Sequence, residues 1–410
     1  MRIVYLHQYF NTPEQHGSTR SYEFARRLAA RGHDVHIVTS ERGERTSGKW
    51  STTAVEGFTV HWRHVPYSND MSAASRLKAF ATFAMAAAGQ ARRLRGDVVF
   101  ATSTPLTIFV PAWYAVAFRR TPLVFEIRDS WPSVPIALGY LRNPVAQFLA
   151  RCLERKAYRR SAHIIALSPG MKEEACLHGA RPDRVTVIPN AADVGLFDVD
   201  QSAGVAWRDS HEIARDVPLV VYAGTLGAAN EVEYLVNVAA EARSLNPQVV
   251  FAIMGTGARE ENIRDLAARK GLLNTTVRLM RPVPKNEIPA FFSAADITTS
   301  VVTDNAAMNA NSANKFFDSL AAGRSIAINH GGWQAELIQE RGVGLVLDRH
   351  DYSAAARQLV EFVEDSSRLL EAGQQALALA KSQFSRDDLA ARLADVLESV
   401  SSSRDNRLTG

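Results

Sequence analysis

The sequence predicts an α/β fold of two doubly wound domains, each a parallel sheet with helices on both faces. Three observations lead to this prediction. The chain has 410 residues, more than one ordinary core requires. Short runs rich in valine and isoleucine alternate with helical patterns, as in parallel sheets covered by helices. The alternation stops in a polar stretch, Asp198 to Asp216, which is typical of a linker, and restarts at Val217.

The first half contains seven apolar runs of strand length. They are residues 2–6, 34–38, 58–62, 97–100, 122–126, 163–166 and 185–188. Between the first two runs, Tyr22, Ala25, Leu28 and Ala29 fall on one helical face, and Gly32 gives a stop signal. We therefore expect a helix over residues 18–31.

The second half repeats this pattern. Its strand-like runs are residues 218–224, 249–254, 277–280, 297–301, 325–328 and 343–346, and its helix-like stretches are 231–245, 260–270, 287–294 and 315–322. We expect domains at 1–198 and 199–384, an amphipathic helix over 385–400 and a disordered tail over 401–410. Ligands of such folds bind at the carboxyl ends of strands, so the cleft between the halves is the expected site.

Composition excludes several classes of protein. The 47 Lys and Arg against 43 Asp and Glu give a net charge of only +4, and the cations are not interleaved with aromatic residues, so we expect no nucleic-acid partner. Cys152 and Cys176 match neither a disulfide framework nor a zinc site. His7 and Gln8 interrupt the first apolar run before it reaches signal-peptide length, so we expect a cytoplasmic protein.

One segment suits a membrane surface. Residues 71–95 combine the apolar side chains Phe80, Phe83 and Met85 with a group of cations: Arg76, Lys78, Arg92, Arg93 and Arg95. A second basic stripe consists of Arg151, Arg155, Lys156, Arg159 and Arg160. We expect Met71 to Arg95 to make peripheral contact with an anionic membrane. The alternative is a helix packed on the core with solvated ends.

Two glycine-containing turns are candidate nucleotide sites. Gly224-Thr225-Leu226-Gly227 follows a strand and leads into a helix near Asn230, so its amide groups could face a diphosphate. The alternative is an ordinary strand-to-helix turn. Gly255 and Gly257 follow the next strand without the third glycine of a nicotinamide site, and we interpret them as a close approach to a nucleotide base.

The stretch from Asn314 to Gly323 is the most specific in the chain. Lys315 and Asp318 lie three residues apart near the start of a predicted helix, where a lysine can meet phosphate and a carboxylate can accept ribose hydroxyls. An exposed ion pair would explain these two residues alone. It would not explain the whole decapeptide.

This decapeptide resembles the helix that follows the sugar-nucleotide loop in family-4 glycosyltransferases, where a carboxylate in the place of Asp318 contacts the ribose. The resemblance continues along the chain. His16-Gly17-Ser18-Thr19-Arg20 is similar to the N-terminal glycine loop, and residues 168–172 and 187–193 are similar to the domain-closing segment. Glu126 to Pro132 resembles the branch that includes N-acetyl-L-fucosamine transferases of O-antigen and capsule synthesis.

The resemblance implies two Rossmann-like domains of the GT-B type, with the C-terminal helix crossing back to the acceptor-binding N-terminal domain. It implies a retaining, metal-independent transferase without a cofactor. The donor would be a UDP-sugar such as UDP-L-FucNAc, and the acceptor a polyprenyl-diphosphate-linked saccharide at the inner face of the membrane. Rivals are a UDP-sugar epimerase of the same fold and a non-catalytic nucleotide-sugar-binding protein.

The resemblance also suggests roles for individual residues. Arg128, Asp129 and Lys315 are the catalytic candidates, although Arg128 and Asp129 would equally suit a structural ion pair. Gly17, Arg20 and Glu126 would form the acceptor and diphosphate loop.

The chain departs from the family in two places. Ala310 stands where a first acid is usual, and Thr225 and Asn230 stand where a cation pair usually binds the diphosphate. The cations would then come from Lys315, Arg20, Arg281 or Lys285. Asp198-Val199-Asp200 superficially matches a metal-binding acidic pair, but we interpret it as a solvated loop and expect no metal.

Overall fold

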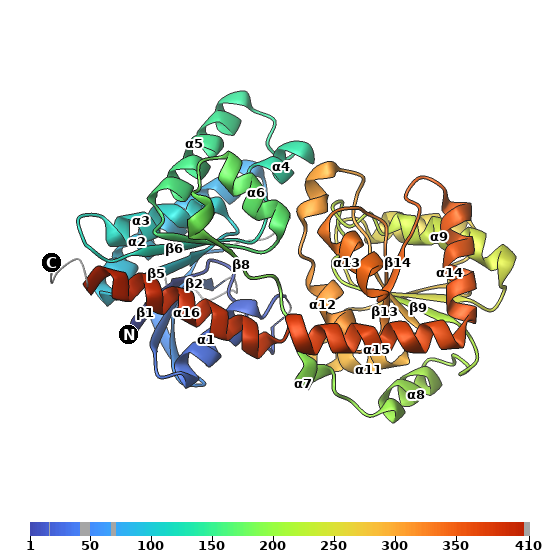
Figure 1. Cartoon of the computed structure of the whole chain (residues 1–410). Coiled ribbons are helices and arrows are strands. Elements are labelled where there is room, and N and C mark those ends of the chain that lie inside the picture. Colours follow the sequence, from blue (N-terminus) through green and yellow to red (C-terminus); the bar gives the residue numbers. More distant parts are fainter. Residues whose placement is uncertain (16, 42–49, 67–70, 406–410) are drawn as a thin grey trace. The chain divides into compact units, whose positions relative to one another are not determined.

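The structure is a computed structural model that describes residues 1–15, 17–41, 50–66 and 71–405. Within these residues the chain forms two compact units. The first comprises residues 1–12, 17–189 and 387–405, and the second comprises residues 13–15 and 190–386. Each unit is a mainly parallel sheet with helices on both faces (Figure 1), as the sequence predicted.

The first unit contains an eight-stranded sheet in the order β3-β4-β2-β1-β5-β6-β7-β8. Its strands are β1 (Arg2–Leu6), β2 (Asp34–Glu41), β3 (Trp50–Val55), β4 (Phe58–His64), β5 (Val98–Thr102), β6 (Leu123–Ile127), β7 (His163–Ala166) and β8 (Val185–Val187). Its helices are α1 (Arg20–Ala30), α2 (Ala73–Leu94), α3 (Phe109–Val116), α4 (Ser133–Ala137), α5 (Pro144–Arg160), α6 (Pro169–Leu177) and α16 (Arg386–Asp405, from Asp387 on), with short 3₁₀ turns η1 (Leu106–Ile108) and η2 (Pro182–Arg184).

Strand β3 is the one strand of the described residues that the sequence did not predict. It pairs antiparallel with β4 at the edge of the sheet, and its residues are exposed or only partly buried. Trp50–Val55 is a polar, threonine-containing stretch, so it lacks the apolar run that marks a buried parallel strand.

The second unit contains a six-stranded parallel sheet in the order β11-β10-β9-β12-β13-β14. Its strands are β9 (Leu219–Ala223), β10 (Val250–Met254), β11 (Val277–Met280), β12 (Ile297–Ser300), β13 (Ser325–Ile328) and β14 (Gly344–Val346). Its helices are α7 (Val194–Phe197), α8 (Gln201–Ser210), α9 (Glu233–Leu245), α10 (Glu260–Arg269), α11 (Ile288–Ala294), α12 (Asn314–Ala321), α13 (Trp333–Arg341), α14 (Tyr352–Glu364) and α15 (Ser366–Gln383), with η3 (Lys285–Glu287) and η4 (Ala306–Ala310).

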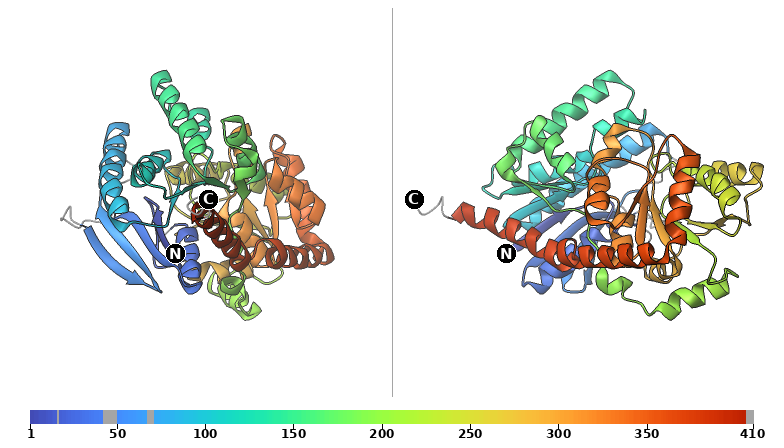
Figure 2. Two further views of the ribbon diagram at one scale, coloured as in Figure 1. Left: turned by 60° about the vertical axis from the view of Figure 1, so that its left-hand side comes forward. Right: turned by 45° about the vertical axis from the view of Figure 1, so that its right-hand side comes forward.

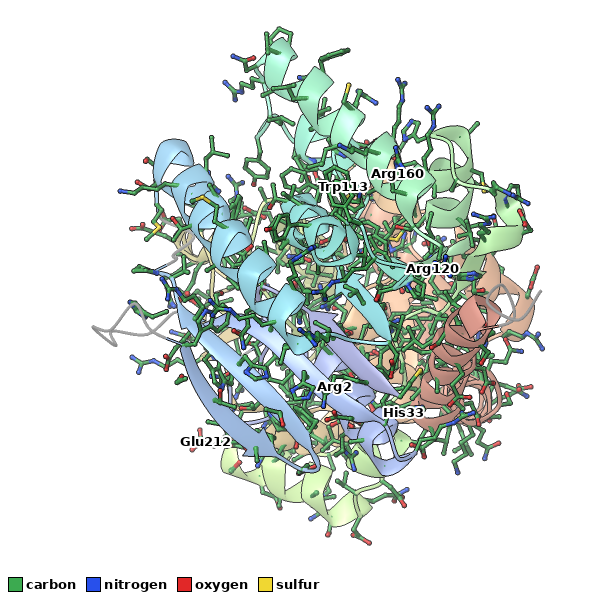
Figure 3. All side chains as sticks on the ribbon, turned by 90° about the vertical axis from the view of Figure 1, so that its left-hand side faces the viewer. Arg2, His33, Trp113, Arg120, Arg160 and Glu212 are labelled. Carbon is green, nitrogen blue, oxygen red and sulfur yellow. The ribbon has the colours of Figure 1, made fainter. Side chains whose placement is uncertain are left out.

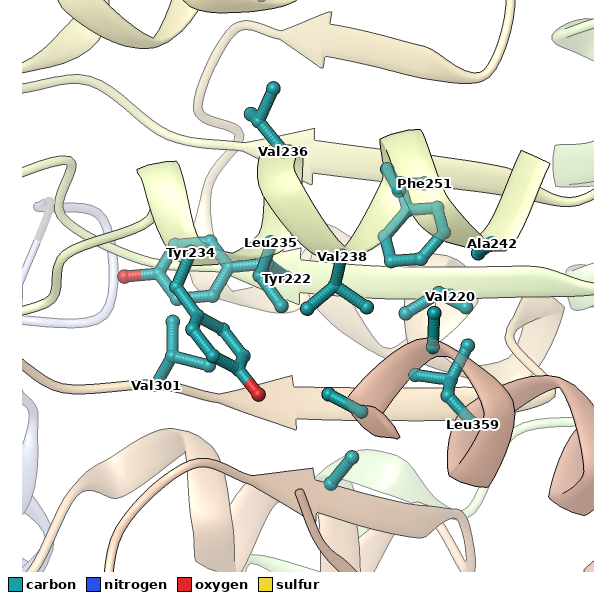
Figure 4. Close-up of a cluster of buried hydrophobic side chains, with 14 of the residues drawn as sticks. Val220, Tyr222, Tyr234, Leu235, Val236, Val238, Ala242, Phe251, Val301 and Leu359 are labelled. Atoms are coloured by element: carbon teal, nitrogen blue, oxygen red, sulfur yellow. The ribbon is translucent and has the colours of Figure 1, made fainter. Parts of the chain in front are cut away.

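Alternate residues of the central strands build two cores in the second unit. Val220 and Tyr222 of β9 pack with α9 and α14 on one face, and Figure 4 shows this core. Leu219 and Val221 pack with α11, α12 and α15 on the other face. This division follows from the two-residue period of a strand, which sends successive side chains to opposite faces.

The boundary between the units falls between Pro189 and Asn190, before the expected position at 198. The side chain of Asn190 donates to the carbonyl of Ser312, and Asp193 pairs with Arg386 at 3.1 Å. These contacts bind the segment after Pro189 to the second unit.

The polar stretch from Asp198 to Asp216 is not a linker, which corrects the expectation above. It contains α8, and Arg208 of this helix donates to the carbonyl of Ala294 and pairs with Asp296 at 2.8 Å. A Cβ on Gly204 would lie 2.5 Å from the backbone of Ser293, so α8 packs tightly on α11. Contacts through an arginine and a glycine leave little apolar periodicity to recognise.

The C-terminal helix belongs to the first unit from Asp387 onward. Arg27 pairs with Asp387 at 2.6 Å, and Arg31 of the chain after α1 pairs with Asp395 at 2.7 Å. The helix continues to Asp405, so the expected disorder from residue 401 is wrong for residues 401–405, and residues 406–410 lie outside the described part. In the described ranges, no helix combines the length and apolar character needed to cross a membrane.

In each unit the strand order reverses beside the first strand. Strands β2 and β5 flank β1 in the first unit, and β10 and β12 flank β9 in the second. The following connections leave in opposite directions at such a switch point, which opens a crevice at the carboxyl ends of the strands. Residues after β1, β5 and β6, and residues after β9, β12 and β13, are therefore the candidates for chemistry.

A buried ion pair holds the first unit together. Arg20 at the start of α1 contacts Glu126 of β6 at 2.8 Å, and both side chains are at most 1% exposed. The guanidinium also donates to the carbonyls of Ile188 and Pro189, and Thr102 donates to the second oxygen of Glu126. Burial lowers the pKa of Arg20, and Glu126 counteracts that effect, so each charge depends on the other.

We expect Arg20→Met to reduce the free energy of unfolding by about 3–5 kcal/mol, because it leaves the Glu126 carboxylate buried without its partner. The double variant Arg20→Met/Glu126→Leu should recover part of this loss. Urea unfolding measures both. Arg181→Met, which breaks an exposed pair with Asp183, is the matched control and should leave stability unchanged. Equal effects of Arg20→Met and Arg181→Met would contradict the role of the buried pair.

Candidate active site

Lys315 lies at the switch point of the second unit. It stands in the first turn of α12, and its ammonium donates to the hydroxyl of Tyr222 at 3.1 Å and to the side-chain oxygen of Asn230 at 3.0 Å. Tyr222 and Asn230 both donate to the carbonyl of Thr225. One small network thus joins Lys315 to the turn that follows β9.

The environment of Lys315 changes its acidity. Burial of the ammonium lowers the pKa of Lys315 to about 8, because within the described residues no carboxylate compensates for the lost hydration. The ammonium also lies 4.6 Å from the ring centre of Tyr222. A desolvated cation without an anionic partner is a suitable binding site for a phosphate group.

Asp318 does not pair with Lys315, so the interpretation of these two residues as an ion pair is wrong. Its carboxylate instead contacts Lys285 of η3 at 2.5 Å, and its side chain is 10% exposed. Lys285 was one of the cations considered for the diphosphate. In the structure it instead pairs with Asp318, the residue predicted to contact the ribose. Arg281, the other candidate on this connection, is exposed. Asn314 is likewise exposed at the first position of α12.

Only part of the turn after β9 has amide groups that point toward a ligand. The N–H groups of Gly224 and Leu226 donate to the carbonyls of Met254 and Thr256, which corrects the expectation that all four amides face a diphosphate. Leu226 also lies in the hydrophobic core. The N–H groups of Thr225 and Gly227 have no backbone partner within the described ranges, and they remain as candidate donors.

Gly255 and Gly257 serve the contact between two loops. A Cβ on Gly255 would lie 1.9 Å from the carbonyl oxygen of Gly224, and one on Gly257 would lie 2.4 Å from that of Leu226. The close approach expected at these glycines is therefore to the backbone of residues 224–227. Neither glycine needs a nucleotide base to explain it.

The sequence did not identify three buried polar residues near this switch point. His330 follows β13, and burial with nearby Arg349 and Lys315 lowers its pKa to about 4, so the ring is neutral at pH 7. Its Nδ1 bonds the carbonyl of Gly331, while Nε2 has no partner in the described part of the chain. The hydroxyl of Ser300 and the amide of Gln334 are also buried without partners there. Ser300 ends β12, His330 stands two residues after β13, and Gln334 stands at a helix start behind two glycines; these positions were the available signal.

The first unit has a second polar cluster, at its own switch point. Arg128 follows β6 and donates to the hydroxyl of Ser18 at 2.9 Å, and it contacts His7 after β1 at 3.3 Å. Asp129 is exposed and accepts a hydrogen bond from Thr104 after β5. Arg128 and Asp129 therefore have separate partners, and the alternative of an ion pair between them is wrong.

The proposed acceptor and diphosphate loop is only partly available. Arg20 and Glu126 are buried in their mutual pair, so Arg20 cannot be one of the cations that neutralise a diphosphate. A Cβ on Gly17 would lie 2.5 Å from the side-chain amide of Asn11, and its φ of +133° also favours glycine. His16 of this loop lies outside the described residues.

Potential metal ligands lie elsewhere. Asp200 caps α8 by accepting from the amide of Ser202, which gives the acidic stretch at 198–200 a structural role. Among the described residues, one group has the composition and spacing of a metal site: Glu154, Glu174 and His178, on or directly after α5 and α6. It contains none of the predicted site residues.

Comparison with known families agrees with this two-unit architecture. Residues 17–196 match the model of Glycosyltransferase Family 4, and residues 205–379 match the model of Glycosyl transferases group 1. The two matches cover most of the chain and divide it close to the observed boundary between the units.

Individual relatives are distant. The chain is 25% identical over 266 residues to WcaI of Escherichia coli K12, named as a colanic acid biosynthesis glycosyl transferase, covering 60% of this chain and 64% of WcaI. It is 25% identical over 315 residues to a GDP-mannose-dependent phosphatidylinositol monomannoside mannosyltransferase of Mycobacterium tuberculosis, covering 75% of this chain and 77% of that protein.

Solved structures share the fold over the whole length. Anabaena HepE, solved with UDP and glucose, has a TM-score of 0.73 and 18% identity, covering 97% of this chain and all of HepE. WaaG, a glycosyltransferase involved in lipopolysaccharide biosynthesis, has a TM-score of 0.71 and 15% identity, covering 96% and 99% of the two chains. The protein therefore belongs to the GT-B glycosyltransferases of family 4.

Proposed function

We propose that this glycosyltransferase transfers a sugar from a UDP-sugar to a lipid-linked saccharide during surface-polysaccharide synthesis, with retention of configuration. One observation carries the proposal. Lys315 is a desolvated cation held by Tyr222 and Asn230 beside the turn after β9, where a doubly wound sheet binds its ligand.

The diphosphate would lie between the side-chain ammonium of Lys315 and the backbone amide groups at the start of α12. Ala313 offers no side-chain cap to this helix, so its first amide groups are suited to an anion. The N–H groups of Thr225 and Gly227 would add donors from the turn. Asp318 would accept a ribose hydroxyl while Lys285 holds its other oxygen. The unpartnered Nε2 of neutral His330 would accept a hydrogen bond from a ligand hydroxyl.

In the proposed reaction, the bond between the anomeric carbon and the diphosphate oxygen breaks as the acceptor oxygen bonds to the same face of the sugar. The acceptor's proton passes to the departing phosphate oxygen, so no protein nucleophile is required. Negative charge develops on the diphosphate, and stabilising it should be the largest catalytic effect. Lys315 and the amide groups would provide this stabilisation without a metal ion or cofactor.

The acceptor would bind at the first unit. Asp129 is exposed after β6 and can accept a hydrogen bond from an acceptor hydroxyl, while Arg128 beside it can contact a phosphate or sugar oxygen. These two residues would orient the acceptor. They would not attack the sugar.

Several features support a lipid-linked acceptor and a peripheral position on the inner face of the membrane. Leu77 and Met85 of α2 are 65% and 73% exposed, and basic residues lie at both ends of this helix. WcaI and WaaG carry names that refer to surface-polysaccharide synthesis. The resemblance of Glu126 to Pro132 to fucosamine transferases favours an N-acetyl amino sugar such as L-FucNAc.

The function is tested by a transfer assay with radiolabelled UDP-sugars and a lipid extract of bacterial membranes. We expect label to enter the organic phase only when donor, lipid and protein are all present. EDTA should not reduce the rate. Lys315→Ala should reduce turnover by about a hundredfold, since it removes one charge-stabilising donor. The exposed variant Lys270→Ala is the matched control and should retain full turnover.

Two other outcomes would contradict the proposal. A new free sugar nucleotide formed without lipid would indicate an epimerase of the same fold. Tight UDP binding without turnover on any lipid fraction would indicate a non-catalytic binding protein. Transfer from GDP-mannose alone would correct the nucleotide, as the mycobacterial relative would suggest.

The affinity for UDP should depend on pH through Lys315. A bound diphosphate raises the pKa of the ammonium, so affinity is fully present below the unbound value of about 8 and falls as pH rises through it. The fall should approach about tenfold per pH unit. Calorimetry from about pH 7 to about 9.5 measures it, with Lys315→Arg as the control, because arginine stays charged up to about pH 12. Equal slopes in both proteins would exclude Lys315 as the titrating group.

A further inference from the structure

Helix α2 has two apolar faces. Ala79, Phe83, Ala87 and Ala91 recur at four-residue spacing, and each is at most 6% exposed against the first unit. A helix that covers a core normally presents polar residues on its other side. Here the outward face carries Leu77, Ala81, Ala84, Met85 and Ala88. The alternative of a core helix with ordinary solvated residues does not explain this second face.

The outward face forms one wall of an apolar groove. The groove has a volume of about 580 Å³ and runs between α2 and α3, which lie side by side in Figure 2. Its lining consists of Leu77, Phe80, Ala81, Ala84, Met85, Ala88 and Gly89 of α2, together with Thr107, Val110 and Tyr114. Almost all of this surface is hydrocarbon, so the groove is suited to an apolar chain.

The chain segment that contains the groove matches a lipid surface. Nine of the fourteen large hydrophobic side chains exposed in the described ranges belong to residues 77–149, including Phe118 and Phe148. Residues 71–153 contain ten Lys and Arg but only three acids, Asp97, Glu126 and Asp129. Helices α2 and α3 face the viewer in Figure 3, where Trp113 of α3 is labelled. A segment with many exposed apolar side chains, many cations and few acids complements an anionic membrane.

The groove and the polar cluster of the first unit share the connection after β5. Thr107 of η1 lines the groove, and Thr104, three residues earlier on the same connection after β5, donates its hydroxyl to Asp129. Arg128 beside Asp129 offers a cation at this end. A molecule with an apolar chain and a polar, phosphate-bearing end could therefore occupy the groove and the strand-end cluster together.

We propose that the α2–α3 groove binds the isoprenoid chain of the lipid-linked acceptor and directs its phosphate-bearing end toward Arg128 and Asp129. This inference rests on the proposed function, and it adds a specific chain-binding site to a general membrane contact. Selectivity for the acceptor lipid would then come from the chain as well as from the saccharide. Bulk phospholipid would contact the exposed side chains around the groove, such as Phe118.

Photolabelling tests the site. The protein is bound to vesicles of phosphatidylcholine and phosphatidylglycerol that contain either a diazirine-bearing polyprenyl phosphate or a diazirine-bearing phosphatidylglycerol at the same mole fraction. We expect the polyprenyl probe to label peptides of α2 and α3 at least about fivefold more than the phospholipid probe, because only the specific lipid occupies the groove.

Gly89→Leu is the variant that fills the groove. A Cβ at this position meets no atom within 4 Å, so there is space at Gly89 for the start of a larger side chain. Labelling by the polyprenyl probe should fall about tenfold, because losing the contacts of about two buried methylene groups lowers the affinity by about that factor. Co-sedimentation with vesicles should stay unchanged. Phe118→Ser, outside the groove, should do the reverse: weaker co-sedimentation but the same label per bound protein.

Equal labelling by the two probes, or labelling that Gly89→Leu leaves unchanged, would overturn the proposal in favour of a bulk-membrane surface. Crosslinks from the polyprenyl probe that map only to residues outside α2, η1 and α3 would also overturn it. UDP calorimetry on the same proteins separates the two levels of inference. Wild-type protein that binds UDP but shows no groove labelling would contradict the chain site alone, whereas groove labelling without UDP binding would contradict the proposed donor.

Discussion

Parallel strand order determines where this chain can place chemistry. In both sheets the order reverses beside the first strand, β1 or β9, and the segments after the neighbouring strands diverge there. The residues that meet at these points are far apart in sequence. Lys315 meets Tyr222 and Asn230 in one unit, and Arg128 meets His7 and Ser18 in the other. Each cluster exists because the parallel register brings the carboxyl ends together.

The two switch points differ in their electrostatics. In the second unit, Lys315 is a desolvated cation that has no carboxylate partner in the described part of the chain, which suits an anionic ligand. In the first unit, Arg20 and Glu126 neutralise each other inside the fold, and the remaining groups are the half-buried Arg128 and the exposed Asp129. This difference is consistent with a division between donor and acceptor, which we propose. The buried pair stabilises the fold, and the unpaired lysine is available for binding.

The sequence predicted the parallel strands well because buried strands leave continuous apolar runs, as Ile3 to Leu6 and Leu219 to Tyr222 do. It failed where packing depends on other chemistry. β3 is exposed or only partly buried, and α8 is held by Arg208 and Gly204 together with the contact of Trp207 with Phe291, so it has no long apolar stripe. These signals are weak in one sequence.

The sequence predicted where the site residues lie along the fold, but it did not predict which side chains they contact. Residue spacing placed Lys315 and Asp318 on one helix, yet their partners, Asn230 and Lys285, come from other elements. Likewise, Gly255 and Gly257 are glycines because the backbone of residues 224–227 packs against them. Such contacts depend on how the connections fold over the sheet, which local periodicity does not encode. A polar residue close after a strand, such as His330 two residues after β13, was an available signal.

The central claim is that Lys315 and Asp318 form the nucleotide site. Calorimetry with UDP, GDP, ADP and NAD tests it most directly, using wild type, Lys315→Ala and Asp318→Ala, with the exposed Lys270→Ala and Asp265→Ala as matched controls. We expect UDP to bind wild type and both controls, and its binding to weaken at least about tenfold in each site variant, since a charged hydrogen bond contributes about 1.5–3 kcal/mol. Binding of NAD alone, or UDP binding that both site variants retain, would contradict it.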